Sequence, residues 1–229
     1  MCSASHPRVK VTLNGPYIVH GGIPLAEKII TPAERGSYVY VEGRTYDVPD
    51  TYSLCRCGKS KVAPFCDGSH VDVGFIGTET ASRDAYDDRA KVYSGPELDL
   101  LDDGRCGLAR FCHRENSEVW TLTSKSDDPK LREAAIRAAQ ECPAGRLTVY
   151  DKDGNELEPD FSASIEILQD PQRGVSGGIA VKGFVPIEAA DGTMYELRNR
   201  VLLCRCGASR NKPFCDATHV SIRWKDGQK

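Results

Sequence analysis

Residues 55–70 read CRCGKSKVAPFCDGSH, and residues 204–219 read CRCGASRNKPFCDATH. Both stretches hold three cysteines and one histidine at the same intervals of two, nine and four positions, and a serine, a proline, a phenylalanine and an aspartate recur inside them. Thiolate and imidazole groups are common ligands of iron and zinc in proteins. We therefore expect two copies of one metal site, with the ligands Cys55, Cys57, Cys66 and His70, and Cys204, Cys206, Cys215 and His219.

The duplication extends beyond the ligands. Residues 18–25 (IVHGGIPL) are matched by residues 180–187 (AVKGFVPI), and an aromatic residue, Phe75 or Trp224, follows each histidine ligand by five positions. We expect these aromatic rings to pack on the sites. Each repeat is too short to bury a sufficient core alone, so bound metal should supply much of its folding free energy, and the two copies should pack on each other.

The first copy contains an addition. Between the shared proline and the first cysteine it has 31 positions where the second copy has 18, a difference of 13 residues. This added part, roughly residues 29–47, is predicted to form a longer hairpin that turns at Gly36 or Gly43.

Composition excludes several classes of protein. The chain of 229 residues is 40% hydrophobic and 28% charged, with a net charge of −3, so neither disorder nor a basic nucleic-acid surface is expected. No long apolar run or secretory signal is visible, which predicts a cytoplasmic protein without a membrane partner. Nine of the ten cysteines lie in clusters typical of metal ligation in a reducing compartment, and Cys2 is expected to be a thiol on a flexible tail.

The middle of the chain has a different character. Residues 129–142 have helical spacing of apolar side chains (Leu131, Ala135, Ala138, Ala139 and Cys142), with Asp127 or Asp128 as the cap and Pro143 and Gly145 as the end. A strand at 147–150 and a turn at 153–154 should follow, and the Gly- and Ser-rich stretch 172–178 reads as a linker. The acidic pairs at 87–88, 102–103 and 127–128 are interpreted as solvated turns rather than catalytic groups.

The spacing within each copy suits two metal ions. Two cysteines separated by one residue can bind one ion from a tight turn, and a cysteine and histidine four positions apart share one face of a helical turn. An aspartate after the third cysteine, Asp67 or Asp216, can cap that turn. Gly58 and Gly207 would let the backbone approach inorganic sulfide.

This arrangement resembles the CDGSH iron–sulfur domain, or NEET, family. The first copy matches the family pattern throughout, and the second departs at Ala217 and Thr218, which leaves its ligands in place. The resemblance implies a [2Fe-2S] cluster in each copy, with the two close cysteines on one iron and the cysteine and histidine on the other. It also implies an intramolecular pseudo-dimer with a β-rich cap. The alternative is a structural zinc site, because three cysteines and a histidine also suit tetrahedral zinc.

The cysteines of the middle segment form another pattern. Cys106, Cys112 and a distant Cys142 before a proline resemble the ligands of a mono-cluster ferredoxin in which Ala109 replaces one cysteine. The expected cofactor is a [3Fe-4S] cluster. His113 is an alternative fourth ligand, and an empty, degenerate ferredoxin fold is the remaining alternative.

A histidine ligand should raise the reduction potential of a cluster and make it responsive to protons, so His70 and His219 are expected to tune the potential and to gate cluster release. We predict an α+β fold with CDGSH domains at 1–84 and 173–229 and a ferredoxin-like domain at 85–172. We expect a monomeric electron-transfer protein that is not an enzyme and whose partner is a redox protein. The alternative is a labile-cluster donor to apo-iron–sulfur proteins or a redox and pH sensor.

Overall fold

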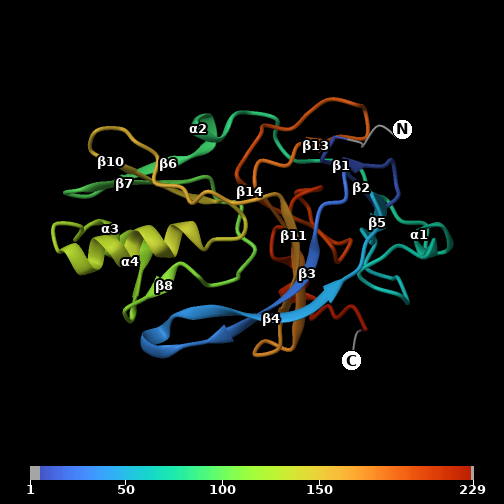
Figure 1. The fold of residues 1–229 in the computed structure, drawn as a ribbon, viewed down its shortest axis with the longest axis horizontal. Helices are drawn as coiled ribbons and strands as arrows, with labels where there is room; N and C mark the ends of the chain where they lie inside the picture. Colours follow the sequence, from blue (N-terminus) through green and yellow to red (C-terminus); the bar gives the residue numbers. More distant parts are fainter. Residues whose placement is uncertain (1–5, 228–229) are drawn as a thin grey trace.

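The computed structural model describes residues 6–227, which fold around two mixed β-sheets with an α+β insert at one end (Figure 1). The strands of these sheets are β1 (Arg8–Val11), β2 (Tyr17–His20), β3 (Leu25–Pro32), β4 (Tyr38–Tyr46), β5 (Thr51–Leu54), β11 (Ser164–Asp170), β12 (Val175–Lys182), β13 (Ile187–Glu188) and β14 (Arg200–Leu203). One sheet has the order β13-β1-β2-β5, and the other has the order β14-β12-β11-β3-β4.

Each copy builds the same three-stranded antiparallel unit. In the first copy β1 pairs with β2 and β2 with β5, and Ile18 faces Ser53. In the second copy β11 pairs with β12 and β12 with β14, and Ala180 faces Leu202, which occupies the position equivalent to Ser53. Identical register in both units shows that the sequence repeat is also a structural repeat.

The strand that follows the antiparallel unit's second strand in each copy, β3 or β13, joins the sheet of the other copy. β3 of the first copy runs parallel to β11 of the second, with Leu25 opposite Ile165, and β13 of the second copy runs parallel to β1 of the first, with Ile187 opposite Val9. Apolar side chains from both sheets form one buried cluster between them. Because each sheet contains strands from both copies, neither copy can bury its core without the other.

The predicted hairpin is present. β3 and β4 pair antiparallel, and the chain turns through a short 3₁₀ helix, η1 (Glu34–Gly36), where Gly36 has a φ of 68°. Gly43 lies instead within β4, and a Cβ atom there would stand 2.7 Å from the Glu27 carboxylate, so it serves close strand packing and not the turn.

The insert has its own core. A three-stranded sheet of order β10-β7-β6, made of β6 (Lys91–Ser94), β7 (Leu98–Asp102) and β10 (Leu147–Asp151), packs on the helices α3 (Val119–Thr123) and α4 (Pro129–Gln140). The remaining elements are α2 (Tyr86–Arg89) and a small hairpin of β8 (His113–Arg114) and β9 (Ser117–Glu118). The predicted helix is confirmed, and its cap is Asp128, whose carboxylate accepts hydrogen bonds from the backbone of Lys130 and Leu131.

The linker predicted at residues 172–178 is wrong. Residues 171–174 form a tight turn, and Val175 already begins β12, which is buried over most of its length. A Cβ atom on Gly177 would lie 2.8 Å from the Leu168 Cβ atom, and one on Gly178 would lie 2.7 Å from the Leu203 oxygen. These glycines allow close contact between strands, and a domain boundary at residue 172 would separate the paired strands β11 and β12.

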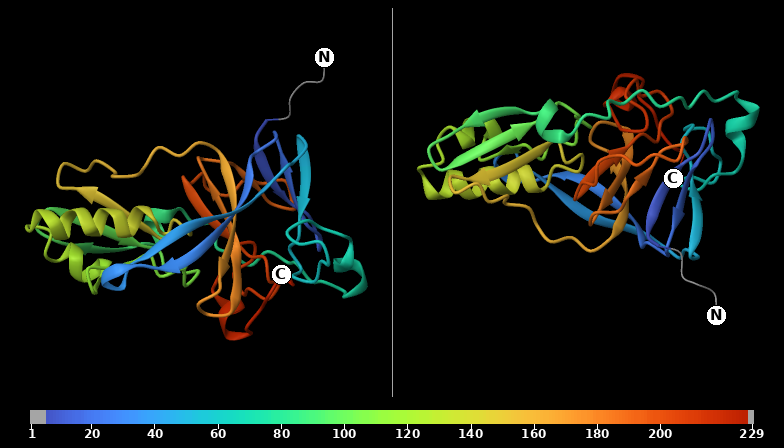
Figure 2. Two further views of the ribbon diagram at one scale, coloured as in Figure 1. Left: turned by 60° about the horizontal axis from the view of Figure 1, so that its bottom comes forward. Right: turned by 90° about the horizontal axis from the view of Figure 1, so that it is seen from above.

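Three parts of the molecule follow one another along its long axis. In Figures 1 and 2 the insert lies at one end, α1 (Ser69–Asp72) of the first copy lies at the other, and the segment with α5 (Thr218–Ser221) lies between them. Among residues 6–227 no helix is both long enough and apolar enough to cross a membrane.

The cap of α4 can be tested with neighbouring aspartates. Asp128→Ala should lower the free energy of unfolding of the insert by about 1 kcal/mol, because two backbone N–H groups lose their acceptor. Asp127→Ala, the control, should change it by less than about 0.5 kcal/mol. Urea unfolding followed by circular dichroism measures both, and equal effects would contradict the assignment of the cap.

Candidate metal centres

The close cysteine pairs hold their sulfur atoms at a distance suited to one metal ion. Cys55 Sγ lies 3.7 Å from Cys57 Sγ, and Cys204 Sγ lies 3.8 Å from Cys206 Sγ. Two thiolates that bind one tetrahedral ion at about 2.3 Å are separated by about 3.8 Å. The loops therefore hold each pair in the geometry that shared coordination requires.

The cysteine and histidine pairs meet the same criterion. Cys66 Sγ lies 3.5 Å from His70 Nδ1, and Cys215 Sγ lies 3.5 Å from His219 Nδ1. A sulfur and a nitrogen bound to one tetrahedral ion at about 2.3 and 2.0 Å are about 3.5 Å apart. Within residues 6–227 no three His, Cys, Asp or Glu side chains converge on a single ion position. The donors are thus arranged as pairs.

The recurring residues between the ligands shape the loops. Ser60 Oγ donates to the Phe65 carbonyl at 2.6 Å and accepts from the Val62 backbone, and the Cys55 N–H group donates to the Pro64 carbonyl at 2.8 Å. The second copy repeats all three bonds, through Ser209, Phe214, Asn211, Cys204 and Pro213. The shared serine, proline and phenylalanine are therefore explained by backbone positioning.

Each aspartate bonds to the first residue of the turn that carries the histidine, although the N-cap positions are Gly68 and Ala217 and not the aspartates that the sequence suggested. Asp67 accepts the N–H groups of Ser69 at 3.0 Å and Lys61 at 2.8 Å, and Asp216 accepts those of Thr218 and Arg210 at the same distances. The backbone of Lys61, followed by Ser69, holds the pKa of the Asp67 carboxyl well below its usual range. Each carboxylate connects the two halves of its metal loop.

The two metal loops touch each other through glycines. A Cβ atom on Gly58 (φ 72°) would lie 2.5 Å from the Cys206 oxygen, and one on Gly207 (φ 79°) would lie 2.5 Å from the Cys57 oxygen. The Trp224 indole N–H group donates to the Gly58 carbonyl at 3.0 Å. The structure therefore assigns these glycines to a reciprocal contact between the copies, whereas the sequence had suggested an approach to sulfide.

This contact predicts a matched pair of destabilised variants. Gly58→Ala and Gly207→Ala should each lose about 1 kcal/mol for the left-handed backbone and about 1–3 kcal/mol more for the steric overlap. Gly174→Ala, at a φ of 66° with no heavy atom within 4 Å of its Cβ position, should lose only the first amount. Thermal unfolding of the metal-loaded chains measures the difference, and three equal losses would contradict the contact.

Buried arginines lie behind both sites, at the position between the close cysteines. Arg56 donates to the carbonyls of Thr12 and Gly77 and lies over the Tyr17 ring. Arg205 donates to the Leu168 carbonyl, but it also pairs with the Asp226 carboxylate at 2.5 Å. The first site therefore has a guanidinium bonded to neutral oxygens beside it, whereas the guanidinium at the second site is neutralised.

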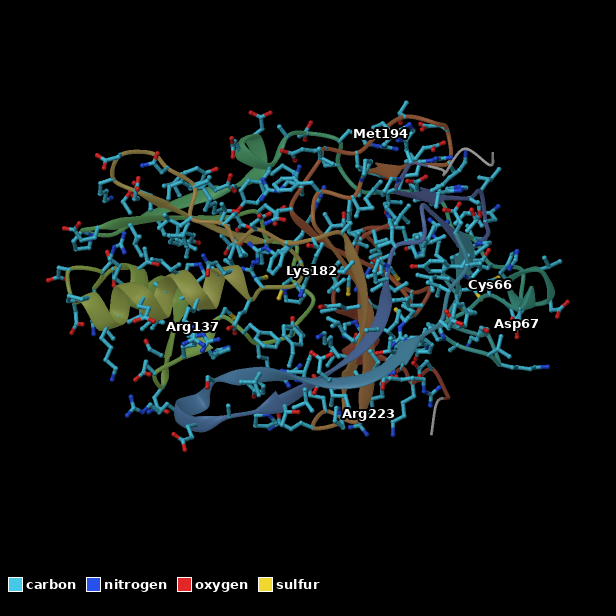
Figure 3. The ribbon with its side chains drawn as sticks, viewed as in Figure 1. Cys66, Asp67, Arg137, Lys182, Met194 and Arg223 are labelled. Atoms are coloured by element: carbon cyan, nitrogen blue, oxygen red, sulfur yellow. The ribbon has the colours of Figure 1, made fainter. Side chains whose placement is uncertain are left out.

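The two sites also differ in burial. His219 and Cys215 are 5% and 4% exposed, whereas Cys66 and His70 are only half-buried. Burial, and then the nearby Arg205 charge, lowers the pKa of His219 to about 4. In Figure 3 Cys66 and Asp67 lie at the end of the molecule opposite Arg137 of α4.

Burial keeps most of the thiols protonated until a cation binds. It raises the pKa of Cys57 to about 11, and it is the main cause of the raised pKa of Cys215. In the close pair of the second copy, the hydrogen bond between the two thiol groups lowers the pKa of Cys204 to about 7 and raises that of Cys206. Thiolates form when a metal replaces these protons, so metal binding should be coupled to proton release.

The three cysteines of the insert share one electrostatic neighbourhood. Burial raises the pKa of Cys112 to about 12, with further contributions from Cys142 and Cys106. Cys106 Sγ accepts the Leu108 N–H group at 3.3 Å, and Cys112 and Cys142 are half-buried against the insert core. These thiols can supply three ligands to a polynuclear cluster.

The position of the replaced cysteine is filled by apolar contacts. Ala109 is buried with Ile30 and Phe111, and the Phe111 ring stacks on Tyr40 of the β3–β4 hairpin with centroids 4.1 Å apart. His113 lies in β8 with its Nδ1 atom 3.9 Å from the Glu118 carboxylate. The added hairpin of the first copy thus packs on the insert around Ala109.

The interpretation of Asp102 and Asp103 as a solvated turn is wrong. Asp102 pairs with Arg146 at 2.5 Å and accepts a hydrogen bond from the Trp120 indole N–H group. Asp103 pairs with Arg89 at 2.9 Å, and the carboxylates of both aspartates are buried. These ion pairs fix the loop that carries Cys106. The alternation of buried residues along β7, which ends on Asp102, was the sequence signal for its burial.

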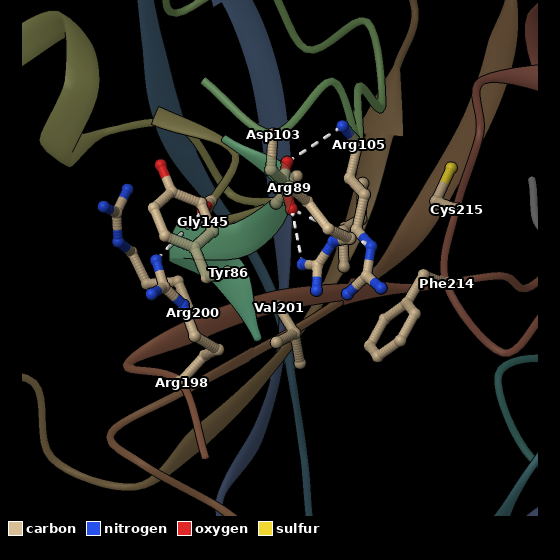
Figure 4. A pocket seen from close by; sticks show the side chains of 12 residues that line it. Tyr86, Arg89, Asp103, Arg105, Gly145, Arg198, Arg200, Val201, Phe214 and Cys215 are labelled. Atoms are coloured by element: carbon tan, nitrogen blue, oxygen red, sulfur yellow. Dashed lines mark hydrogen bonds and ion pairs between the residues drawn. The ribbon is translucent and has the colours of Figure 1, made fainter. Parts of the chain in front are cut away.

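Figure 4 shows the crevice where this loop meets the second copy. It is lined by residues of both, including Arg89, Asp103, Arg105, Phe214 and Cys215. The ferredoxin-like insert and the second metal site are thus direct neighbours.

Comparison with protein families agrees with this geometry. The iron-binding zinc finger CDGSH type matches residues 14–71 and 176–220, and the divergent 4Fe-4S mono-cluster family matches residues 93–152. No curated protein and no solved structure matches the chain. The fold and the paired donors define an iron–sulfur protein. The chain thus contains two CDGSH-type segments with a mono-cluster segment between them, as the sequence predicted.

Proposed function

We propose that the chain is an electron-transfer protein with three iron–sulfur clusters. Two are [2Fe-2S] clusters bound by Cys55, Cys57, Cys66 and His70, and by Cys204, Cys206, Cys215 and His219. The third is a [3Fe-4S] cluster bound by Cys106, Cys112 and Cys142. A redox protein is the proposed partner, and no enzymatic activity is assigned.

The pairing of the donors is the observation that supports this proposal most. In a binuclear cluster each iron takes two protein ligands and completes its tetrahedron with bridging sulfide. A mononuclear zinc site needs four donors around one point. The pairs at 3.5–3.8 Å, without a convergent set of three within residues 6–227, favour the binuclear cluster over zinc.

Reciprocal contacts support an intramolecular pseudo-dimer. The exchanged strands β3 and β13 and the facing glycines Gly58 and Gly207 relate the copies as an isologous interface relates two subunits. One chain then contains both halves, and we propose that it acts as a monomer.

The histidine ligands favour electron transfer. Neutral imidazole in place of thiolate removes one negative charge from a cluster and so raises its reduction potential. The buried guanidinium group of Arg56, which is bonded to neutral carbonyl oxygens, acts in the same direction at the first site. We further propose the cytoplasm as the location, because the nine cysteines described are free thiols.

The insert suits a cluster with three protein ligands. Its three thiols have a shared environment, and the contacts of Ala109 with Ile30 and Phe111 leave the fourth corner against apolar side chains. This surrounding favours [3Fe-4S], because a fourth iron would have no protein ligand.

Electron paramagnetic resonance tests the set of clusters. The oxidised protein should give a signal from one [3Fe-4S] cluster, since oxidised [2Fe-2S] clusters are silent, and reduction should bring out the two [2Fe-2S] clusters. Cys112→Ser should abolish the first signal and retain the second. If the oxidised protein contains both [2Fe-2S] clusters but gives no paramagnetic signal, the proposed [3Fe-4S] cluster would be contradicted and the other two clusters would stand.

Cluster donation to apo-proteins is the second candidate function. The half-buried Cys66 and His70 favour it, because ligand exchange requires access to the cluster. Transfer of iron and sulfide to an apo-ferredoxin, measured beside reduction by a reductase, distinguishes a donor from a carrier.

The role of imidazole can be tested in each copy separately. His70→Cys and His219→Cys should each retain a coloured cluster and lower its reduction potential, because a thiolate adds one negative charge. Potentiometric titration followed by visible absorption measures the change. Unchanged potentials in both variants would show that these histidines are not ligands.

A further inference from the structure

Two segments from outside the second copy cover its metal site. The first is residues 79–82, which follow the first copy. The N–H groups of Thr80 and Ala81 donate to the Lys212 carbonyl at 2.8 and 3.0 Å, and Thr80 Oγ1 donates to the Arg210 carbonyl at 2.8 Å. This segment is therefore bonded to the loop between Cys206 and Cys215.

The second cover is the insert loop 104–108. A Cβ atom on Gly107 would lie 2.2 Å from Leu202 Cδ2 and 3.9 Å from Cys215 Sγ. The Arg105 guanidinium lies 4.4 Å from the centre of the Phe214 ring and donates to the Ser82 carbonyl. The loop that carries Cys106 is thus packed on the second site.

The equivalent face of the first site is open. Val71, directly after His70, is 73% exposed, whereas its equivalent Val220 is half-buried, and the ligands Cys66 and His70 are half-buried where Cys215 and His219 are buried. Figure 3 places Cys66 at the outer end of the molecule. A partner can approach this site without any rearrangement of the insert.

We infer that the two CDGSH sites have different tasks. The second site is an internal relay between the insert and the first site, and the first site is the port that faces partner proteins. The order of the three parts in Figures 1 and 2 and the contact between Gly58 and Cys206 provide this path. This inference rests on the proposed function, because it assumes that both sites hold clusters.

The redox balance of such a path is simple. A one-electron carrier protein exchanges electrons at the first site, so the carrier is oxidised when the insert is reduced and is reduced when the insert is oxidised. The second cluster returns to its initial state after each transfer. Loss of the second cluster would require local opening of loop 104–108, whereas the first can be lost from the folded chain.

Cluster removal from the loaded full-length chain tests this order. Bathophenanthroline disulfonate would remove iron at neutral pH while iodoacetamide alkylates each released thiol, and mass spectrometry would identify the peptides. Cys66 should be alkylated at least about tenfold faster than Cys215, which corresponds to a local opening cost of about 1.4 kcal/mol. Equal rates, or faster alkylation of Cys215, would overturn the inference.

A substitution in the insert loop 104–108 provides the second measurement, again of the alkylation rates. Arg105→Ala removes the guanidinium from Phe214 and from Ser82, and it should speed the alkylation of Cys215 severalfold while that of Cys66 stays the same. Arg137→Ala, the control, makes the same change on the outer face of α4 and should alter neither rate. An unchanged Cys215 rate in Arg105→Ala would contradict the covering role of the loop.

The proposed function fails separately from this inference. A chain without iron and sulfide would overturn both, because no cluster would distinguish the sites. A chain with both [2Fe-2S] clusters and equal alkylation rates would overturn the division of tasks and leave the electron-transfer proposal standing.

Discussion

The structure depends on donor pairs that short loops hold at bonding distance for a metal. Cys57, whose sulfur lies 3.7 Å from that of Cys55, has a pKa raised by burial, so a cation is the natural replacement for its proton. The free energy of that replacement is available to fold two three-stranded units that are too small to be stable alone. Metal binding and formation of the β framework are therefore linked.

The duplication makes the two sites dependent on each other. One sheet takes β13 from the second copy and the other takes β3 and β4 from the first, and each metal loop rests on a glycine of the other, so loss of one loop should weaken the second. Reciprocity does not require identical surroundings. The insert packs on the β3–β4 hairpin of the first copy, but its loop 104–108 lies against the metal site of the second copy, to which the neutralised Arg205 and the buried His219 belong.

Sequence reasoning predicted that the cysteine and histidine side chains lie together in pairs and that the helix α4 forms, because each follows from spacing between near neighbours. It did not predict the strand exchange, because the pairing of Val9 with Ile187 depends on contacts far apart in the chain. The linker prediction failed because Gly177 and Gly178 look flexible in sequence but lie in a buried strand. The different burial of His70 and His219 depends on the tertiary surroundings of each turn, such as the packing of α5 on β12, for which the ligand motif has no signal.

Quantitative analysis of iron and acid-labile sulfide tests the central claim most directly. The anaerobically purified chain should contain about seven irons and about eight sulfides, and a triple serine variant of Cys106, Cys112 and Cys142 should contain about four of each. Zinc without sulfide at the paired donors would contradict the account.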